Sequence, residues 1–230
     1  MTENMTPVDP YWIDSPGRVR AIQAAMAQEG IDVYLGSRLR TLSWVLDAFC
    51  PWRSYLVIPS EGLPTAITFV IDAARVADES WLDEDHVLGY GPMGGQDQVS
   101  LLQGLMAPCL KGGRGTVGIE SGMATYLPEG NLTHYEYESL AAALPGARLV
   151  NAHDIVDRLS LIKDEGTVNR FREASRIVDV GHRAVYEAIC HGGYQGMTET
   201  EIGGLAAYAM RKAGSECEWS FTGGNEIASG

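Results

Sequence analysis

Segments typical of strands alternate with segments typical of helices through the first 150 residues of the chain. Short apolar runs are separated by longer stretches whose apolar residues recur at three- and four-residue steps. This alternation predicts an α/β domain with a sheet flanked by helices. The predicted strands are Ile31–Leu35, Tyr55–Ile58, Pro64–Phe69, His86–Tyr90, Thr116–Glu120 and Arg148–Asn151. The predicted helices are one opening near Ser15, then Ala73–Trp81, Val99–Leu110 and Tyr135–Leu144.

The first helix carries signals at both of its ends. Ser15 is a suitable N-cap and Pro16 suits the first helical position, where its missing N–H has no partner to lose. Gly30 supplies the backbone freedom that ends a helix. The apolar face between these ends is formed by Val19, Ile22 and Met26.

The chain changes character near residue 156. Asp164 is placed to cap a long helix that reaches to about Cys190, and Thr198 and Glu201 form a capping box for another. Cys217–Thr222 reads as a strand. Two helices and one strand cannot close a core, and the strand would have an unpaired edge. We therefore expect a first domain over residues 1–155, and over 156–230 the truncated start of a larger domain.

Composition narrows the class of partner. The formal net charge is −13, which argues against a nucleic-acid footprint and against binding to anionic membrane surfaces. There is no basic, apolar leader at the N-terminus and no run of about 20 apolar residues, so a cytoplasmic location is expected. The cysteines have no zinc-type spacing and are expected to be buried thiols: Cys50, Cys109, Cys190 and Cys217.

No motif supplies a catalytic residue or a metal ligand. Ser121 lacks the flanking glycines of a nucleophile elbow. Asp179 and His182 are spaced as a ligand pair on one helix, but a bundle metal site needs a second such helix, and the sequence offers none.

Trp52 and Arg53 are the one candidate substrate-binding pair. They stand at the entry to an apolar strand, and a planar guanidinium beside an aromatic ring can clamp a carboxylate. The alternative is an arginine at a strand end that simply packs over the tryptophan.

Several short motifs, in this order and spacing, resemble the two-domain pita-bread hydrolases: creatinase, Xaa-Pro aminopeptidase and prolidase. The motifs are Arg18–Asp32, Val117–Glu120, Leu159–Glu165 at the domain junction, Ala174–Gly181 and Gly196–Ile202. The chain departs from the family at Ser160, where arginine is usual, and in Leu39–Phe49, which lacks the segment N-x-x-Y-L-T-G-F.

The resemblance implies a creatinase-type domain with a mixed sheet, followed by the truncated start of an α+β pita-bread domain. It also implies a metal-dependent hydrolase that cleaves the bond before proline in small peptides, using water activated by two divalent ions (Mn, Co or Zn). The metal ligands of the family lie downstream of Gly230, so the chain alone is expected to hold no metal and to be inactive. In creatinase-type homodimers, an aromatic–arginine pair matching Trp52 and Arg53 reaches into the partner's active site and binds the substrate carboxylate.

Two alternatives stay open on the sequence. The unusual stretch from Trp44 to Arg53 favours a creatinase-like or lyase-like enzyme acting on a small, non-peptide carboxylate. The absence of metal ligands within the 230 residues favours a non-catalytic module for dimerisation or binding.

Overall fold

The computed structural model describes residues 9–123, 129–193 and 195–215, and divides into two compact units. One unit is Asp14–Ile162, and the other joins Lys163 and the residues after it to the residues before Asp14. The predicted boundary between residues 155 and 156 falls inside a helix, α6 (His153–Leu159). Ile155 and Val156 of this helix are fully buried in the core of the first unit, which is why the unit extends to Ile162.

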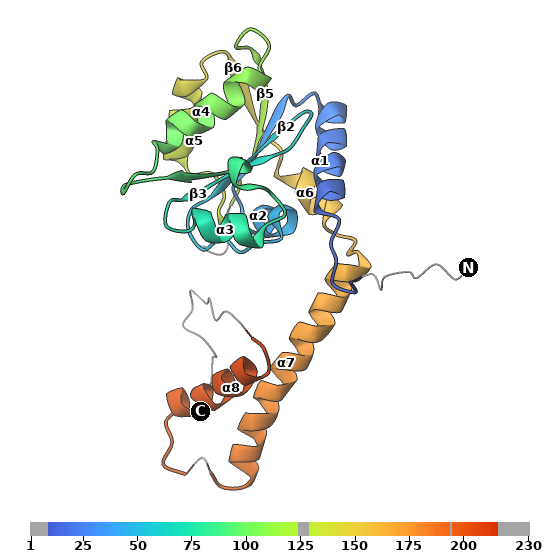
Figure 1. The fold of residues 1–230 in the computed structure, drawn as a ribbon, viewed down its shortest axis with the longest axis vertical. Coiled ribbons are helices and arrows are strands. Elements are labelled where there is room, and N and C mark those ends of the chain that lie inside the picture. The colour runs from blue at the N-terminus through green and yellow to red at the C-terminus, as the bar shows by residue number, and fades with distance from the viewer. Residues whose placement is uncertain (1–8, 124–128, 194, 216–230) are drawn as a thin grey trace, which may run out of the picture. The chain divides into compact units, whose positions relative to one another are not determined.

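A six-stranded mixed sheet forms the centre of the first unit, in the order β4-β3-β2-β1-β5-β6 (Figure 1). β1 pairs parallel to β5 and antiparallel to β2, β2 pairs antiparallel to β3, and the outer pairs β3–β4 and β5–β6 are parallel. The six strands expected before residue 155 are all present, with ends displaced by at most two residues. Their bounds are β1 (Val33–Gly36), β2 (Tyr55–Pro59), β3 (Thr65–Phe69), β4 (Val87–Tyr90), β5 (Gly115–Ile119) and β6 (Ala147–Asn151).

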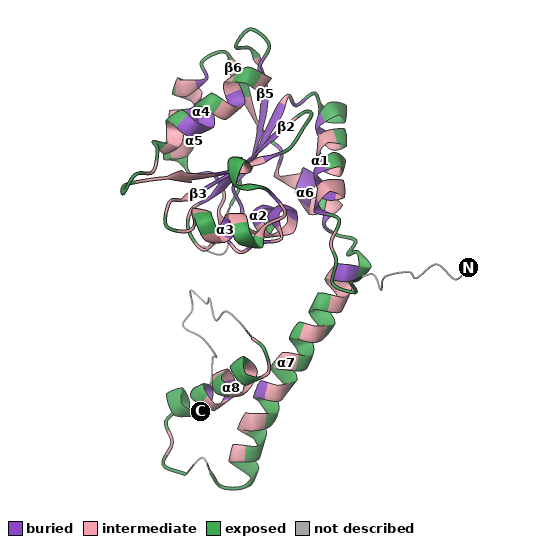
Figure 2. Ribbon diagram, in the orientation of Figure 1, coloured by how far each residue is buried: buried purple, intermediate pink, exposed green. Residues whose placement is uncertain are grey.

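Helices cover both faces of this sheet, and a separate apolar core lies under each layer. Neighbouring residues of β1 point to opposite faces, so Tyr34 joins one core while Val33 and Leu35 join the other. The inner strands β1, β2, β3 and β5 are mostly buried, whereas the outer strands β4 and β6 are more exposed (Figure 2). The first layer is α1 (Ser15–Glu29), α2 (Leu39–Leu46), α3 (Ala73–Glu79) and α6; the second is α4 (Gln98–Met106) and α5 (His134–Ala143). The 3-10 turns η1 (Glu84–His86) and η2 (Ala107–Cys109) adjoin β4 and α4.

The cap of α1 differs from the sequence expectation. Asp14, not Ser15, is the N-cap, and its carboxylate accepts a hydrogen bond of 2.8 Å from the amide of Gly17. Ser15 is instead the first helical residue and is buried. An ionised carboxylate is favoured at this position because it also interacts with the positive end of the helix dipole. The predicted end of the helix is confirmed, because Gly30 adopts φ 67° in the left-handed region.

α2 was not expected from the sequence. Its N-cap residue, Arg38, makes no capping hydrogen bond with its own side chain, so the usual local start signal is missing. The segment lies between β1 and β2 and buries Thr41, Leu42, Val45 and Leu46. What stabilises its first turn comes from a distant part of the chain.

The described residues of the second unit form the helices α7 (Glu165–Cys190) and α8 (Glu199–Lys212). Both predicted starts are confirmed: Asp164 accepts from the amide of Thr167 at 2.7 Å, and Thr198 forms a reciprocal capping box with Glu201. The helices pack closely at Gly181, where a Cβ atom would lie 2.9 Å from Cγ of Met210. The predicted strand Cys217–Thr222 lies outside the described residues. No helix among the described residues has the length and hydropathy to cross a bilayer.

Candidate functional site

The carboxyl ends of β1 and β5 form a point where the chain leaves the sheet in two directions. These neighbouring strands are parallel, yet β1 continues into α2 on one face and β5 leads on to α5 on the other. In α/β domains, such a switch point is where ligands usually bind. The residues at this switch point therefore form the candidate site.

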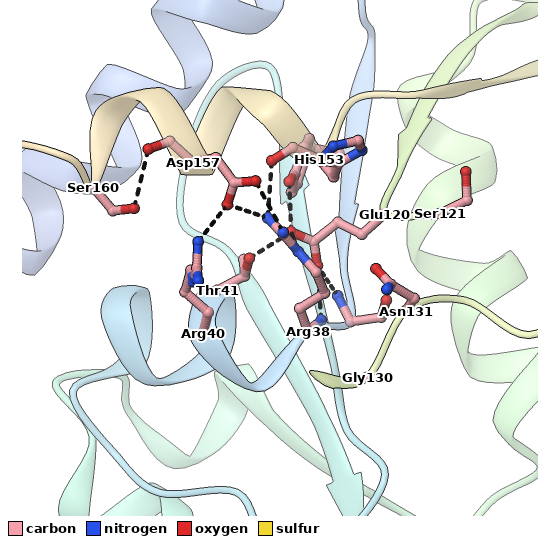
Figure 3. Close-up of polar contacts among 12 residues, drawn as sticks. Arg38, Arg40, Thr41, Glu120, Ser121, Gly130, Asn131, His153, Asp157 and Ser160 are labelled. Carbon is pink, nitrogen blue, oxygen red and sulfur yellow. Dashed lines mark hydrogen bonds and ion pairs between the residues drawn. The ribbon is translucent and has the colours of Figure 1, made fainter. Parts of the chain in front are cut away.

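A fully buried carboxylate fills this position. Glu120 directly follows β5 and has no exposed surface. Its Oε2 accepts hydrogen bonds from the amides of Ser37 (2.6 Å) and Arg38 (2.7 Å). Its Oε1 accepts from Tyr34 Oη (2.8 Å), from Nε of Arg38 (3.1 Å) and from the hydroxyl of Thr41 (Figure 3). Glu120 thus supplies, from 82 residues away, the cap that α2 lacks in its own sequence.

The last residue of β1 leaves room for this arrangement. Gly36 has no side chain, and a Cβ atom placed on it would lie 2.8 Å from Cγ2 of Thr41. That approach is closer than real Cβ contacts allow, so glycine is required for Thr41 to reach Glu120 from the first turn of α2.

Arg38 extends the network from the sheet to α6. Its guanidinium donates to Asp157 at 2.9 and 3.2 Å and to the carbonyl oxygen of His153 at 2.8 Å (Figure 3). Arg40 donates to the same Asp157 carboxylate at 3.0 Å. Burial alone would raise the pKa of Asp157, but the hydrogen bonds and charges of Arg38 and Arg40 outweigh it and lower that pKa. Burial, reinforced by the charge of Glu120, raises the pKa of Tyr34 well above its usual value.

Arg53, one of the two predicted substrate ligands, is engaged inside its own domain. Its Nε and Nη2 donate to the carboxylate of Glu136 at 2.7 and 2.8 Å, and its Nη1 donates to the carbonyl oxygen of Gly130 at 2.6 Å. Its guanidinium lies 4.9 Å from the centre of the Tyr55 ring. To bind a substrate carboxylate, Arg53 would first have to release the carboxylate of Glu136.

Glu136 receives enough donors to stay ionised despite its burial. Burial alone would raise the pKa of Glu136, but the hydrogen bonds from Arg53 and Tyr55 and the Arg53 charge lower it. Tyr55 Oη also accepts from Nε2 of Gln98. The same carboxylate closes the capping box of α5 with Thr133.

Trp52, the other predicted ligand, points to solvent. Its side chain is large and apolar, yet the residue is 53% exposed. Its ring lies 5.6 Å from that of Phe69, which in turn lies 5.7 Å from the ring of Tyr90. Tyr90 Oη donates to the carbonyl oxygen of Arg53 at 2.7 Å, which fixes the backbone next to Trp52. The structure therefore separates the pair, with Arg53 directed inward and Trp52 outward.

Sequence reasoning missed the charged residues that organise both networks: Arg38, Glu120, Glu136 and Asp157. A signal was present for two of them, because Arg38 and Glu120 each stand just beyond the end of an apolar strand. Their meeting depends on β1 and β5 being parallel neighbours, which spacing in the sequence does not reveal.

Within residues 9–123, 129–193 and 195–215, no three His, Cys, Asp or Glu side chains come together in a way that would hold a metal ion. The described residues therefore do not fit the two-ion site that the family resemblance implies. No catalytic step is assigned to them.

A comparison with protein families decides the relationship. The model of the "Creatinase/Prolidase N-terminal domain" matches residues 18–162, which is nearly all of the first unit. The chain belongs to the creatinase/prolidase family. The mixed sheet flanked by helices is the architecture expected of this family's N-terminal domain.

One curated hydrolase is similar to this creatinase/prolidase chain in sequence, and many solved structures share its fold. An ectoine hydrolase of Halomonas elongata is 26% identical over 181 residues, which cover 75% of this chain and 44% of that protein. The X-Pro aminopeptidase of Thermotoga maritima MSB8 has a TM-score of 0.64 at 20% identity, covering 86% of this chain and 50% of that one. The prolidase of Pyrococcus horikoshii OT3 has a TM-score of 0.63 at 18% identity, covering 87% and 50%. The chain thus spans about half the length of the relatives it matches.

Proposed function

We propose that this chain is the N-terminal part of a hydrolase that acts on a small substrate bearing a carboxylate. The observation that carries the proposal is the family match over residues 18–162, together with the relatives of about twice the length. In this proposal the chain supplies a platform, and the bond-breaking groups lie in the part of the relatives that it does not cover.

The first candidate reaction is cleavage of the bond before proline in a small peptide. The junction motif Leu159–Glu165 and the turn Gly196–Ile202 support it, since they resemble those of the family to which the Xaa-Pro peptidases belong. Two divalent ions (Mn, Co or Zn) held by residues outside this chain would polarise the scissile carbonyl and activate water.

The second candidate is hydrolysis of a small, non-peptide carboxylate. The 26% identity to an ectoine hydrolase over three quarters of this chain favours it. Hydrolysis of an Xaa-Pro dipeptide but not of ectoine would support the first candidate, and the reverse would support the second. A third possibility, a non-catalytic dimerisation or binding module, would be supported if the folded, metal-supplemented protein from its native source hydrolysed neither compound.

We propose that Trp52 contacts substrate across the interface of a homodimer, with Arg53 setting the position of its backbone and binding the substrate carboxylate when Glu136 releases it. The exposed ring of Trp52 and the held backbone beside it support this role. Sedimentation equilibrium tests the dimer, and a monomer at micromolar concentration would contradict it.

The Trp52→Ala variant tests the substrate contact. Loss of an aromatic contact costs about 0.5–1.5 kcal/mol, so KM should rise up to about tenfold. Trp12→Ala is the matched control, since Trp12 is equally exposed but lies in the other unit. Equal kinetics in wild type and Trp52→Ala would remove Trp52 from the site.

We place the protein in the cytoplasm, since Cys50, Cys109 and Cys190 are all free thiols.

A further inference from the structure

The donors around Glu120 have the composition of an anion-binding site. The backbone amides of Ser37 and Arg38, which directly precede α2, converge on the two carboxylate oxygens together with one guanidinium N–H and two hydroxyl groups. Helix N-terminal amides and arginine are the donors with which α/β domains bind external anions at the carboxyl ends of parallel strands. Here the anion comes from the chain itself.

Because Arg38 is buried, its positive charge needs an anionic partner close by. The side chain of Arg38 is 4% exposed and that of Glu120 is 0% exposed, so neither group can be satisfied by bulk water. A buried cation and buried amides that lose their acceptor carry a large desolvation cost. A neutral group in place of the carboxylate would leave Arg38 with a single anionic partner among the described residues, the carboxylate of Asp157, which Arg40 shares.

Ser37 also carries a hydroxyl group that does not bind Glu120. The hydroxyl oxygen of Ser37 is buried and, within the described part of the chain, has no hydrogen-bond partner. It belongs to the residue whose amide binds Oε2 of Glu120. A buried hydroxyl without a hydrogen-bond partner is unusual in a folded protein.

We propose that the crevice between the ends of β1 and β5 is an anion-binding site that the chain keeps filled with its own Glu120 carboxylate. When that side chain is removed, the site binds a free small monocarboxylate. The ligand class follows from the atoms: Glu120→Ala removes Cγ, Cδ and both oxygens, which together are the heavy atoms of acetate. The native site is therefore closed to phosphates and nucleotides, and its anion joins β1, β5 and α2.

Thermal unfolding of the 230-residue chain tests the proposal. Glu120→Ala should have a Tm several degrees below wild type in sodium chloride, and its Tm should rise with the logarithm of acetate concentration at constant ionic strength and pH 7. Phosphate should give no such rise, because it is larger than the group that Glu120→Ala removes and would bring two further oxygens into a buried space shaped for a carboxylate. Wild type and Glu61→Ala, which removes an exposed glutamate, should show no specific effect of acetate. An equal acetate effect on wild type, or none on a folded Glu120→Ala, overturns the proposal.

Glu120→Gln decides the matter if the alanine variant does not fold. The amide keeps the shape of the side chain and fills the space, but it has no charge and only one acceptor oxygen. We expect a lower Tm than wild type and no response to acetate. A Glu120→Gln variant as stable as wild type between pH 6 and 8 would show that the donors around Glu120 do not require an anion, and would overturn the proposal.

Discussion

The guanidinium of Arg53 binds the carboxylate of Glu136 through two hydrogen bonds, of 2.7 and 2.8 Å, between residues 83 positions apart in the sequence. The pair joins the entry of β2 to the first turn of α5. A third donor atom, Nη1 of Arg53, holds the carbonyl oxygen of Gly130 at 2.6 Å. The arginine that the sequence marks as a substrate ligand is thus first a structural tie, and its removal should disturb folding as well as binding.

Arg53→Ala should therefore destabilise the chain. We expect a loss of about 1–3 kcal/mol, because the partly buried Glu136 is left without its charged partner. Urea unfolding followed by circular dichroism measures it. The matched control is Trp52→Ala, an exposed neighbour whose effect on stability should stay within about 0.5 kcal/mol. Equal stability of Arg53→Ala and wild type would show that the pair contributes nothing.

The Arg53–Glu136 pair also predicts a dependence of stability on pH. Since the folded-state pKa of Glu136 is lowered, its contribution is present above the unfolded pKa of about 4.3 and is lost as pH falls through the folded value. The free energy of unfolding should accordingly drop as the pH falls from about 5 towards 3. Glu136→Gln should show a shallower slope over the same range. Parallel pH profiles of the two proteins would contradict the lowered pKa.

Asp157 and Arg40 belong to the same network, but the Arg40 side chain is the more exposed of the two, so their removal should have different effects on stability. Asp157→Asn should cost about 1–2 kcal/mol, because the buried Arg38 loses a charged partner on α6. Arg40→Ala should cost no more than about 0.5 kcal/mol, since the Arg40 side chain is mostly exposed. Urea midpoints of both variants check the difference, and equal losses would show that burial of Arg38 does not matter.

The thiols should differ sharply in reactivity. Burial raises the pKa of Cys50 to about 11, so the folded protein at pH 8 presents almost no Cys50 thiolate. Cys190 was expected from the sequence to be buried but is exposed, so it should react with iodoacetamide before Cys50. Peptide mapping by mass spectrometry identifies the labelled site, and Cys190→Ser serves as the control. Labelling of Cys50 as fast as that of Cys190 would contradict its burial.

The strands and most helix ends could be predicted because their signals are local. Gly30, Asp164 and the Thr198–Glu201 box each act within one helical turn, and the apolar runs of the strands are continuous in sequence. Even the error at the first cap was small, since Asp14 and Ser15 are adjacent and both suit the position.

The parts that could not be predicted depend on contacts between distant residues. α2 begins where Glu120, just beyond the end of β5, accepts from the amides of Ser37 and Arg38, so the start of the helix has no signal in the neighbouring sequence. Arg53 shows the same limit, because its partner Glu136 lies 83 residues further along the chain, in α5. The motif around Trp52 and Arg53 was recognisable, but the direction of each side chain was decided by tertiary packing.

The most direct test of the proposed function is turnover by the protein isolated from its native source. Each of the two candidate substrates is incubated with the folded, metal-supplemented protein, and product is measured by mass spectrometry. We predict hydrolysis of one of them, in proportion to protein concentration, with a higher KM in the Trp52→Ala variant. Hydrolysis of neither by a folded sample would contradict the assignment as part of a hydrolase for small carboxylate substrates.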